Sequence, residues 1–194
     1  MSRVGTVERK TKETSVSVTV DLDGSGGVSV NTGIAFFDHM LDQLGRHASL
    51  DLTIKTTGDL HIDEHHTIED TSLALGEAIN EALGNRAGIN RFGDATVPLD
   101  EALALAVIDF SGRPHLSYSC PPMPPIIGSY DTTLTKHIFA SLANASKATI
   151  HIKVLDGENA HHMVEAQFKA FARALKQAVA RTGLADVPST KGVL

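Results

Sequence analysis

Paired histidines followed by a glutamate occur once in each half of the 194-residue chain, as HHTIE from His65 and as HHMVE from His161. On a helix, with about 100° per residue, the glutamate projects about 40° from one histidine and about 60° from the other. The two histidines of a pair diverge by about 100°. The glutamate can therefore join either imidazole at a metal ion, but adjacent histidines rarely reach the same ion. If all these side chains bind metal, the spacing predicts two ions.

Two further histidines, His39 and His137, lie 98 positions apart in segments with apolar residues at helical spacing. Imidazole and carboxylate ligands without thiolate suit Mn²⁺, Fe²⁺, Co²⁺ or Zn²⁺, and open sites with a carboxylate favour Mn²⁺. We therefore expect two Mn²⁺ per subunit, with other divalent transition metals as alternatives. The predicted ligands are six histidines and two glutamates: His39, His65, His66, Glu69, His137, His161, His162 and Glu165.

Several other polar residues are expected to support the ligands or to have structural roles. Three carboxylates flank the first histidine pair and are expected to hydrogen-bond ligand imidazoles: Asp63, Glu64 and Asp70. The remaining histidines lack a repeated partner pattern and are expected to be structural: His47, His61, His115 and His151. The single cysteine, Cys120, lies beside two prolines and is expected to be an inert loop residue.

The repeat extends beyond the histidines, because each half reads strand, helix, strand, helix. The matching segments are 13–24 and 101–112, 36–45 and 134–145, 50–55 and 149–154, and 67–84 and 163–180. Their offset grows from 88 to 98 because a proline-rich loop at 120–129 has no counterpart, and it falls to 96 at the histidine pairs. A duplicated half-domain explains this order better than chance.

A duplicated half-domain predicts an α+β protein in which each half forms a small sheet with helices on one face. The two helical faces would then bury each other. We expect a single domain over residues 1–194, with halves at about 1–88 and 89–187 and a C-terminal tail at 188–194.

Composition excludes several classes of protein. The net charge of −6 argues against a general nucleic-acid surface, and no apolar run approaches the length of a membrane span. The N-terminal segment lacks the apolar stretch of a secretory signal, and one cysteine permits no internal disulfide. These features predict a cytoplasmic protein with neither nucleic-acid nor membrane partners.

The residues and their order closely resemble the imidazoleglycerol-phosphate dehydratase family. The matching segments span nearly the whole chain: GIAFFDHMLDQLGRH, GDLHIDEHHTIEDTSLALGEA, INRFGDATVPLDEALALAVIDFSGRP, TKHIFASLANASKATIHIKVLDGENAHHMVEAQFKAFARAL and VPSTKG. The resemblance implies four helices between two four-stranded mixed sheets, a ribosomal protein S5 domain 2-like fold. It also implies a homo-oligomer of twenty-four subunits with Mn²⁺ pairs at subunit contacts. By resemblance, one ion takes His65, His137, His161 and Glu165, and the other takes His39, His66, Glu69 and His162.

The activity that the resemblance implies is loss of water from imidazoleglycerol phosphate to give imidazoleacetol phosphate, in histidine biosynthesis. The C–H bond that breaks is next to no carbonyl, so it is not acidic. Two ions on the two ring nitrogens would stabilise an imidazolate, because bound cations depress the pKa of a coordinated acid. The imidazolate can expel hydroxide to give a diazafulvene, and proton loss from the next carbon yields an enol and then the ketone.

The resemblance also assigns residue roles. Catalytic roles fall to Glu13, His66 and Glu165, with Glu13 as the candidate proton shuttle. Contacts to the hydroxyls and phosphate of the substrate are assigned to Glu13, Gln43, Arg91, Arg113, Lys169, Ser189 and Lys191.

Two rival interpretations stay open from the residues alone. The first is a two-metal phosphohydrolase, in which an ion-activated hydroxide attacks phosphorus, although such sites rely more on aspartates than this histidine-rich set. The second is a non-catalytic, metal-storing shell, which symmetric ligands alone leave open. Release of inorganic phosphate would favour the first rival.

Overall fold

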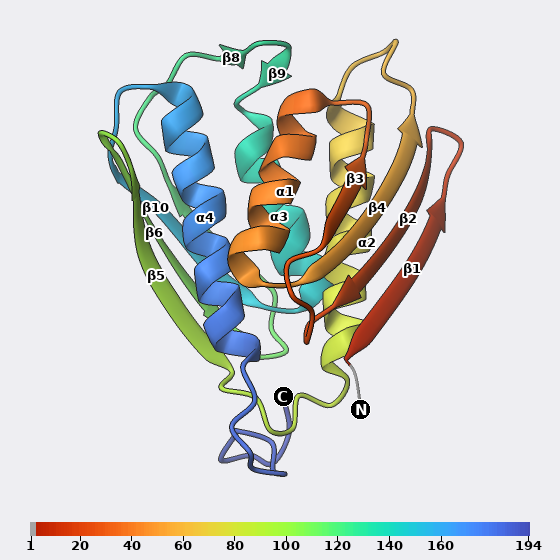
Figure 1. Cartoon of the computed structure of the whole chain (residues 1–194), viewed down its shortest axis with the longest axis vertical. Coiled ribbons are helices and arrows are strands. Elements are labelled where there is room, and N and C mark those ends of the chain that lie inside the picture. The colour runs from red at the N-terminus through yellow and green to blue at the C-terminus, as the bar shows by residue number, and fades with distance from the viewer. Residues whose placement is uncertain (1–2) are drawn as a thin grey trace.

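Each half of the chain folds into a four-stranded sheet (Figure 1). The computed structural model describes residues 3–194. The first sheet has the order β1-β2-β4-β3, from β1 (Val4–Lys10), β2 (Thr14–Asp21), β3 (Val28–Asn31) and β4 (Asp51–Gly58). The second has the order β5-β6-β10-β7, from β5 (Phe92–Leu99), β6 (Ala102–Asp109), β7 (His115–Ser119) and β10 (Thr149–Asp156). In both, the last pair is parallel and the other pairs are antiparallel, so the two sheets share one topology.

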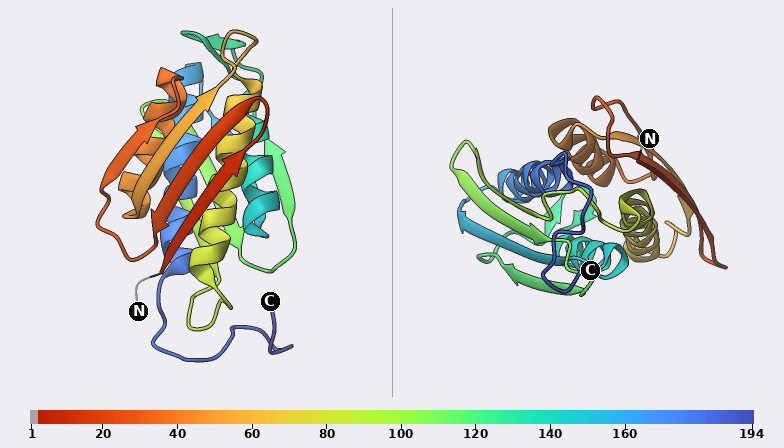
Figure 2. Two further views of the ribbon diagram at one scale, coloured as in Figure 1. Left: turned by 90° about the vertical axis from the view of Figure 1, so that its right-hand side faces the viewer. Right: turned by 90° about the horizontal axis from the view of Figure 1, so that it is seen from below.

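Four helices form a layer between the sheets (Figures 1 and 2): α1 (Ala35–Ala48), α2 (His65–Leu83), α3 (Leu134–Ser146) and α4 (Ala160–Val179). Helix α2 packs on the first sheet and α4 on the second, while α1 contacts α4 and α3 contacts α2. Each helix pair therefore joins the two halves. The predicted α+β fold, with duplicated halves and helices between two mixed sheets, is confirmed. The boundaries expected for the halves and the tail stay a prediction.

The core lies between the sheets and the helices. Val16, Val18 and Val20 of β2 are buried and alternate with more exposed residues, which is the pattern of a strand with one covered face. Phe139 of α3 is fully buried between Phe168 and Phe171 of α4, with ring centroids 5.2 and 5.5 Å away. The proline-rich loop and the residues after it form a small sheet of β8 (Ile126–Ile127) and β9 (Tyr130–Asp131).

A glycine in each first strand lets a helix approach the sheet closely. A Cβ atom at Gly5 of β1 would overlap the carbonyl oxygen of Ala78 in α2, and one at Gly93 of β5 would overlap that of Ala174 in α4. These two contacts occupy matching places in the two halves. They fix how deeply each histidine-bearing helix sits on its sheet.

All four helices begin at the same end of the molecule, which is the upper end in Figure 1. The predicted metal ligands lie within the first two turns of these helices, so the fold gathers them at that end. The segment after α4 lies at the opposite end (Figure 1). Among the described residues, no helix is long and apolar enough to cross a membrane.

Candidate metal centre

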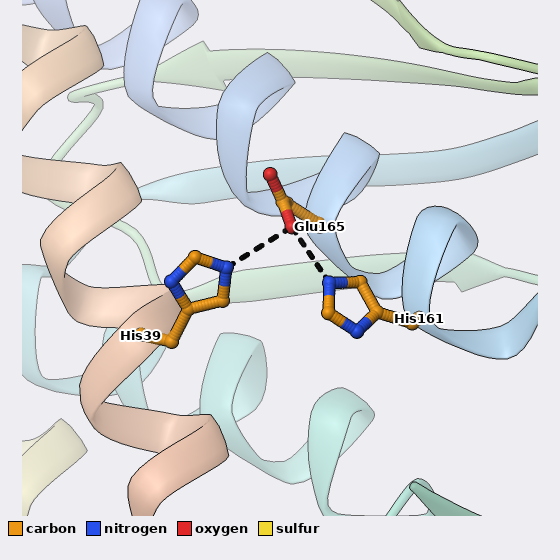
Figure 3. Close-up of side chains that lie close together, drawn as sticks. All are labelled: His39, His161 and Glu165. Atoms are coloured by element: carbon orange, nitrogen blue, oxygen red, sulfur yellow. Dashed lines mark hydrogen bonds and ion pairs between the residues drawn. The ribbon is translucent and has the colours of Figure 1, made fainter.

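One cluster of candidate ligands joins α1 to α4 (Figure 3). Nε2 of His39 and Nε2 of His161 lie 3.2 and 2.9 Å from Oε2 of Glu165. Glu165 is only 7% exposed, and its Oε1 lies 2.6 Å from Nζ of Lys169. Burial raises the pKa of the Glu165 carboxyl, but contacts with Lys169, His161 and His39 outweigh it and lower the pKa to about 2. The cluster therefore holds a carboxylate at neutral pH.

A second cluster joins α2 to α3 with the same composition. It consists of His65 and Glu69, one helical turn apart on α2, and His137 from α3. Nε2 of His137 lies 3.2 Å from Oε1 of Glu69, and the rings of His65 and His137 are 4.7 Å apart at their centroids. The two clusters are counterparts, because each combines a histidine and a glutamate of one helix with a histidine from the neighbouring helix.

Both clusters fit a divalent transition-metal ion. In each, one ligand atom per residue lies within 4.8 Å of the other two. Ligands at about 2.1 Å from an octahedral ion lie about 3 Å from each other, close to the separations between these donors. Nε2 of His137 is buried and, although it lies near Oε1 of Glu69, it makes no hydrogen bond of acceptable geometry among residues 3–194, as expected of an atom that binds a metal. Three protein donors per cluster would leave coordination positions for further ligands.

The other histidine of each pair lies outside these clusters. In both pairs the ring centroids are 6.1 Å apart and the ring planes differ by 82°, in agreement with the divergence expected on a helix. Nδ1 of His66 lies 3.0 Å from Oδ2 of Asp59, and Nδ1 of His162 lies 2.7 Å from Oε2 of Glu101. These contacts raise the pKa of both imidazoles, lower the pKa of Asp59, and lower the pKa of Glu101 to about 2.

The clusters within one chain combine residues from both ion sets that the resemblance implies. His39 lies with His161 and Glu165, although the resemblance assigns it to the other ion. The same holds for Glu69, which lies with His65 and His137. The implied sets therefore need residues from more than one chain, and they stay a prediction.

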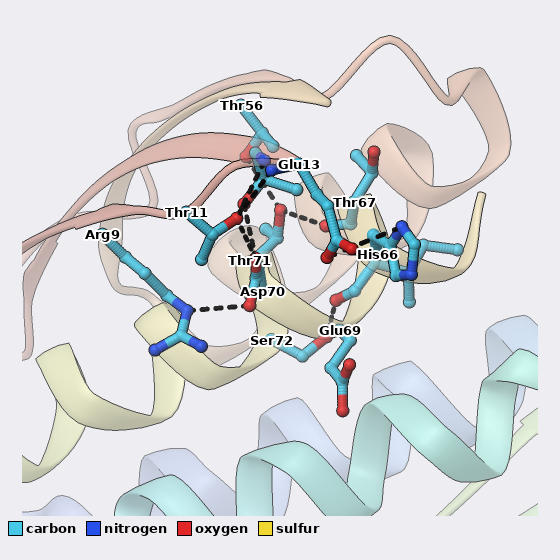
Figure 4. A network of polar contacts seen from close by, with 12 residues as sticks. Arg9, Thr11, Glu13, Thr56, His66, Thr67, Glu69, Asp70, Thr71 and Ser72 are labelled. Atoms are coloured by element: carbon cyan, nitrogen blue, oxygen red, sulfur yellow. Dashed lines mark hydrogen bonds and ion pairs between the residues drawn. The ribbon is translucent and has the colours of Figure 1, made fainter. Parts of the chain in front are cut away.

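Glu13 lies beside one of these outlying histidines (Figure 4). Its Oε2 is 3.8 Å from Nδ1 of His66, and its backbone N–H donates to Oγ1 of Thr11 at 3.1 Å. Glu13 directly precedes β2, so the turn between β1 and β2 sets its position. The proposed proton shuttle is thus placed next to a predicted ligand.

The three carboxylates expected to hydrogen-bond ligand imidazoles have other partners. Asp70 accepts from Nε of Arg9 at 2.8 Å (Figure 4). It also accepts from Oγ1 of Thr14, so its expected role is wrong. Asp63 accepts from the backbone N–H of His65, the first residue of α2, at 2.8 Å. Burial raises the pKa of Glu64, and the neighbouring Ser129 and the backbone of Asp131 oppose this rise. Sequence reasoning also missed the contacts of Asp59, in the connection between β4 and α2, and of Glu101, in the turn before β6.

The residues assigned to phosphate do not lie together in one chain. Four of them line a cavity of about 240 Å³ that the C-terminal tail helps to form: Arg91, Arg113, Ser189 and Lys191. The Arg91 guanidinium donates to Asp109 at 2.7 and 3.1 Å and to the carbonyl oxygen of Pro188 at 2.9 Å, which ties the tail to β6. Lys169 lies instead at the first cluster, paired with Glu165.

Gln43 lies on α1, one turn beyond His39, and its Oε1 is 3.1 Å from Nε2 of His47. His47 also lines a small cavity with Arg173, Lys176 and Gln177 of α4. Burial lowers the pKa of His47, and Lys169 and Arg173 lower it further. The structural role expected for His47 therefore includes holding a predicted substrate contact. The sequence signal for this contact is that His47 follows Gln43 by four residues, which is one turn of a helix.

Comparisons with known proteins identify the family of the chain. The family model described as imidazoleglycerol-phosphate dehydratase matches residues 32–175. An imidazoleglycerol-phosphate dehydratase of Frankia casuarinae is 60% identical over the full length of both chains. The crystal structure of the Staphylococcus aureus enzyme superposes with a TM-score of 0.84 at 33% identity, covering 92% of this chain and 99% of that one. The Pyrococcus furiosus structure gives 0.83 at 38% identity, covering 97% and 100%. The chain therefore belongs to the imidazoleglycerol-phosphate dehydratase family and is a hydro-lyase.

Proposed function

We propose that this chain catalyses the metal-dependent dehydration of imidazoleglycerol phosphate to imidazoleacetol phosphate, a step of histidine biosynthesis in the cytoplasm. The observation that carries the proposal is the pair of matching clusters, each with two histidines and a glutamate, in a chain of this family. A substrate ring with two nitrogens corresponds to two equivalent ligand clusters. When bound, two divalent ions, with Mn²⁺ favoured, would stabilise the imidazolate form of that ring, from which hydroxide leaves to give a diazafulvene.

The residues of the chain bind the substrate and move protons. Glu13 takes the proton from the carbon chain and returns one during formation of the ketone; it lies 3.8 Å from His66 and its side chain is 52% exposed, so it is accessible to a ligand. His66 and Glu165 hold metal ions, and Gln43 contacts the substrate hydroxyls. The cavity formed by Arg91, Arg113, Ser189 and Lys191 binds the phosphate. Lys169 keeps Glu165 ionised through its 2.6 Å ion pair.

A second copy of the chain completes each site in this proposal. The metal clusters lie where the helices begin, whereas the phosphate cavity is lined by the C-terminal tail. The tail lies at the opposite end of the chain from the starts of the helices (Figure 1). One small substrate molecule cannot reach both ends of a chain. A symmetric homo-oligomer, for which we propose twenty-four subunits, brings the tail end of one subunit to the metal clusters of another.

The experiment is to add Mn²⁺ and imidazoleglycerol phosphate to protein stripped with a chelator. We expect ultraviolet absorbance of the keto product to appear only after metal is restored, with no release of inorganic phosphate. Phosphate release without ketone would establish the phosphohydrolase instead. Tight metal binding with neither product would identify a metal-storing shell.

A further inference from the structure

The two halves differ in the segment that connects a strand to its histidine-bearing helix. A Cβ atom at Gly58, the last residue of β4, would overlap Thr67, which follows the first histidine pair. A Cβ atom at Gly157, directly after β10, would overlap Met163, which follows the second pair. The glycines are therefore equivalent. They lie 99 positions apart, whereas the histidine pairs lie 96 apart, so the second connection is three residues shorter.

The longer connection carries the carboxylate that contacts His66. Asp59 directly follows Gly58, and its Oδ2 lies 3.0 Å from Nδ1 of His66. In the second half the residue after the equivalent glycine is Glu158, which is exposed. The contact to His162 comes instead from the turn between β5 and β6.

Glu101 in that turn contacts two residues at the N-terminal end of α4, His162 and Asn159. Its Oε2 lies 2.7 Å from Nδ1 of His162, and its Oε1 accepts the backbone N–H of Asn159 at 2.8 Å. Asn159 in turn caps α4 by accepting from the backbone N–H groups of His161 and His162. The same contact to an outlying histidine is thus made from a different place in each half.

Glu101 and Glu13 are counterparts in the repeat, since each directly precedes the second strand of its half. Their surroundings nevertheless differ. Glu101 makes the 2.7 Å contact to its histidine, whereas Glu13 stays 3.8 Å from His66, where Asp59 makes the shorter contact. One of two equivalent glutamates is engaged by a histidine, and the other is left available.

We propose that Glu101 and Asp59 are positioning residues, which bind Nδ1 of His162 and His66 so that Nε2 of each ring is presented to metal. The inference rests on the proposed function, because it assumes that both histidines are ligands. A carboxylate on one ring nitrogen fixes the tautomer and the orientation of the ring, and it strengthens metal binding at the other nitrogen. In the first half, Asp59 performs this role and leaves Glu13 free for proton transfer.

The test measures Mn²⁺ binding to the assembled protein from the electron paramagnetic resonance signal of free aqueous Mn²⁺. We expect Glu101→Ala to weaken one of two sites by about 10- to 100-fold. Glu101→Gln, which keeps an acceptor for Nδ1–H, should recover most of the affinity. The exposed neighbour Glu158→Ala removes the same charge and serves as the matched control, with unchanged binding. Glu13→Gln should keep both ions and lose turnover.

A double-mutant cycle with His162→Ala separates positioning from a structural effect. If Glu101 acts through His162, Glu101→Ala causes no further loss of Mn²⁺ affinity once His162 is absent. If Glu101→Ala weakens Mn²⁺ binding equally with and without His162, the proposal is overturned, because Glu101 would then act through the backbone at Asn159. Wild-type affinity in Glu101→Ala would also overturn it. The same cycle with Asp59→Ala and His66→Ala tests the first half.

The two proposals fail in different ways. If wild-type protein shows no Mn²⁺ binding or no dehydration, the proposed function fails. If the wild type binds two ions and turns over while Glu101→Ala binds Mn²⁺ equally well, the positioning role alone fails.

Discussion

Asp70 connects the first hairpin to the helix that carries a histidine pair. It is 6% exposed and accepts from Arg9 on β1 and from Thr14 on β2. Oγ1 of Thr11, which also lies near this carboxylate, accepts the backbone N–H of Glu13. The position of the proposed proton shuttle therefore depends on a network without any predicted metal ligand.

We expect Asp70→Ala to destabilise the fold by about 2 kcal/mol, because it leaves a buried threonine hydroxyl and a partly exposed guanidinium without their acceptor. Turnover should fall as well, while both Mn²⁺ remain bound. Thermal unfolding and Mn²⁺ titration provide the measurements. Glu77→Ala, at an exposed position of the same helix, should leave the unfolding midpoint and Mn²⁺ binding unchanged. Equal unfolding midpoints for the two variants would contradict the role given to Asp70.

Asp23 provides a prediction about pH. Ion pairs with Arg3 and Arg181, each at 2.6 Å, hold the pKa of Asp23 well below its usual range. A depressed folded-state pKa stabilises the protein above the unfolded value of about 4, and this contribution is lost as the pH falls below it. Asp23→Asn should therefore cost about 1 kcal/mol at pH 7, since the groups are partly exposed, and less at pH 3.

Unfolding midpoints across this pH range check that prediction. The exposed Asp94→Asn is the control and should differ little from the wild type at either pH. A gap between Asp23→Asn and the wild type that stays constant down to pH 3 would show that the ion pairs do not depress the pKa of Asp23.

Local patterns in the sequence predict the four helices and the two central strands of each sheet, β2 and β4 in the first and β6 and β10 in the second. They indicate neither the outer strands, which only the family resemblance implies, nor the contacts between distant elements. The apolar spacing after His65 predicts a helix to residue 84, and α2 ends at Leu83. The packing of α1 against α4 depends on how the two halves face each other, so no local pattern indicates that His39 meets His161. Asp59 and Glu101 escaped notice for a related reason: they occupy different places in the two halves, so the repeat does not mark them.

The close approach of helix to strand gives a test of the packing. Alanine in place of a strand glycine ordinarily stabilises a fold by restricting the unfolded chain, by about 0.4–1 kcal/mol. At Gly5 the new Cβ would overlap Ala78, so Gly5→Ala should instead destabilise by about 1–3 kcal/mol. Glu8→Ala, on the exposed face of the same strand, is the matched control in thermal unfolding. A higher midpoint for Gly5→Ala would refute the packing of α2 on β1.

The two ends of the molecule have different chemistry. Histidines and glutamates gather where the helices begin, and arginines with the tail form a cavity at the other end. In the proposed reaction, which needs both groups on one substrate, the metal end of one subunit and the phosphate end of another would form each site. Burial of the sites between subunits would also exclude water from the reacting ring.

Mixing two inactive variants tests this arrangement directly. His162→Ala impairs the metal end and Arg113→Ala impairs the phosphate end, so oligomers of either variant alone should have little activity. Co-expressed in equal amounts, they should regain activity at up to roughly one quarter of the sites, because some sites then combine an intact metal end with an intact phosphate end in a symmetric oligomer. Arg113→Ala mixed with Lys191→Ala is the control, since both residues line the same cavity of one chain and cannot complement each other. If the first mixture is as inactive as the control although its oligomers contain both variants, each site is built within a single chain.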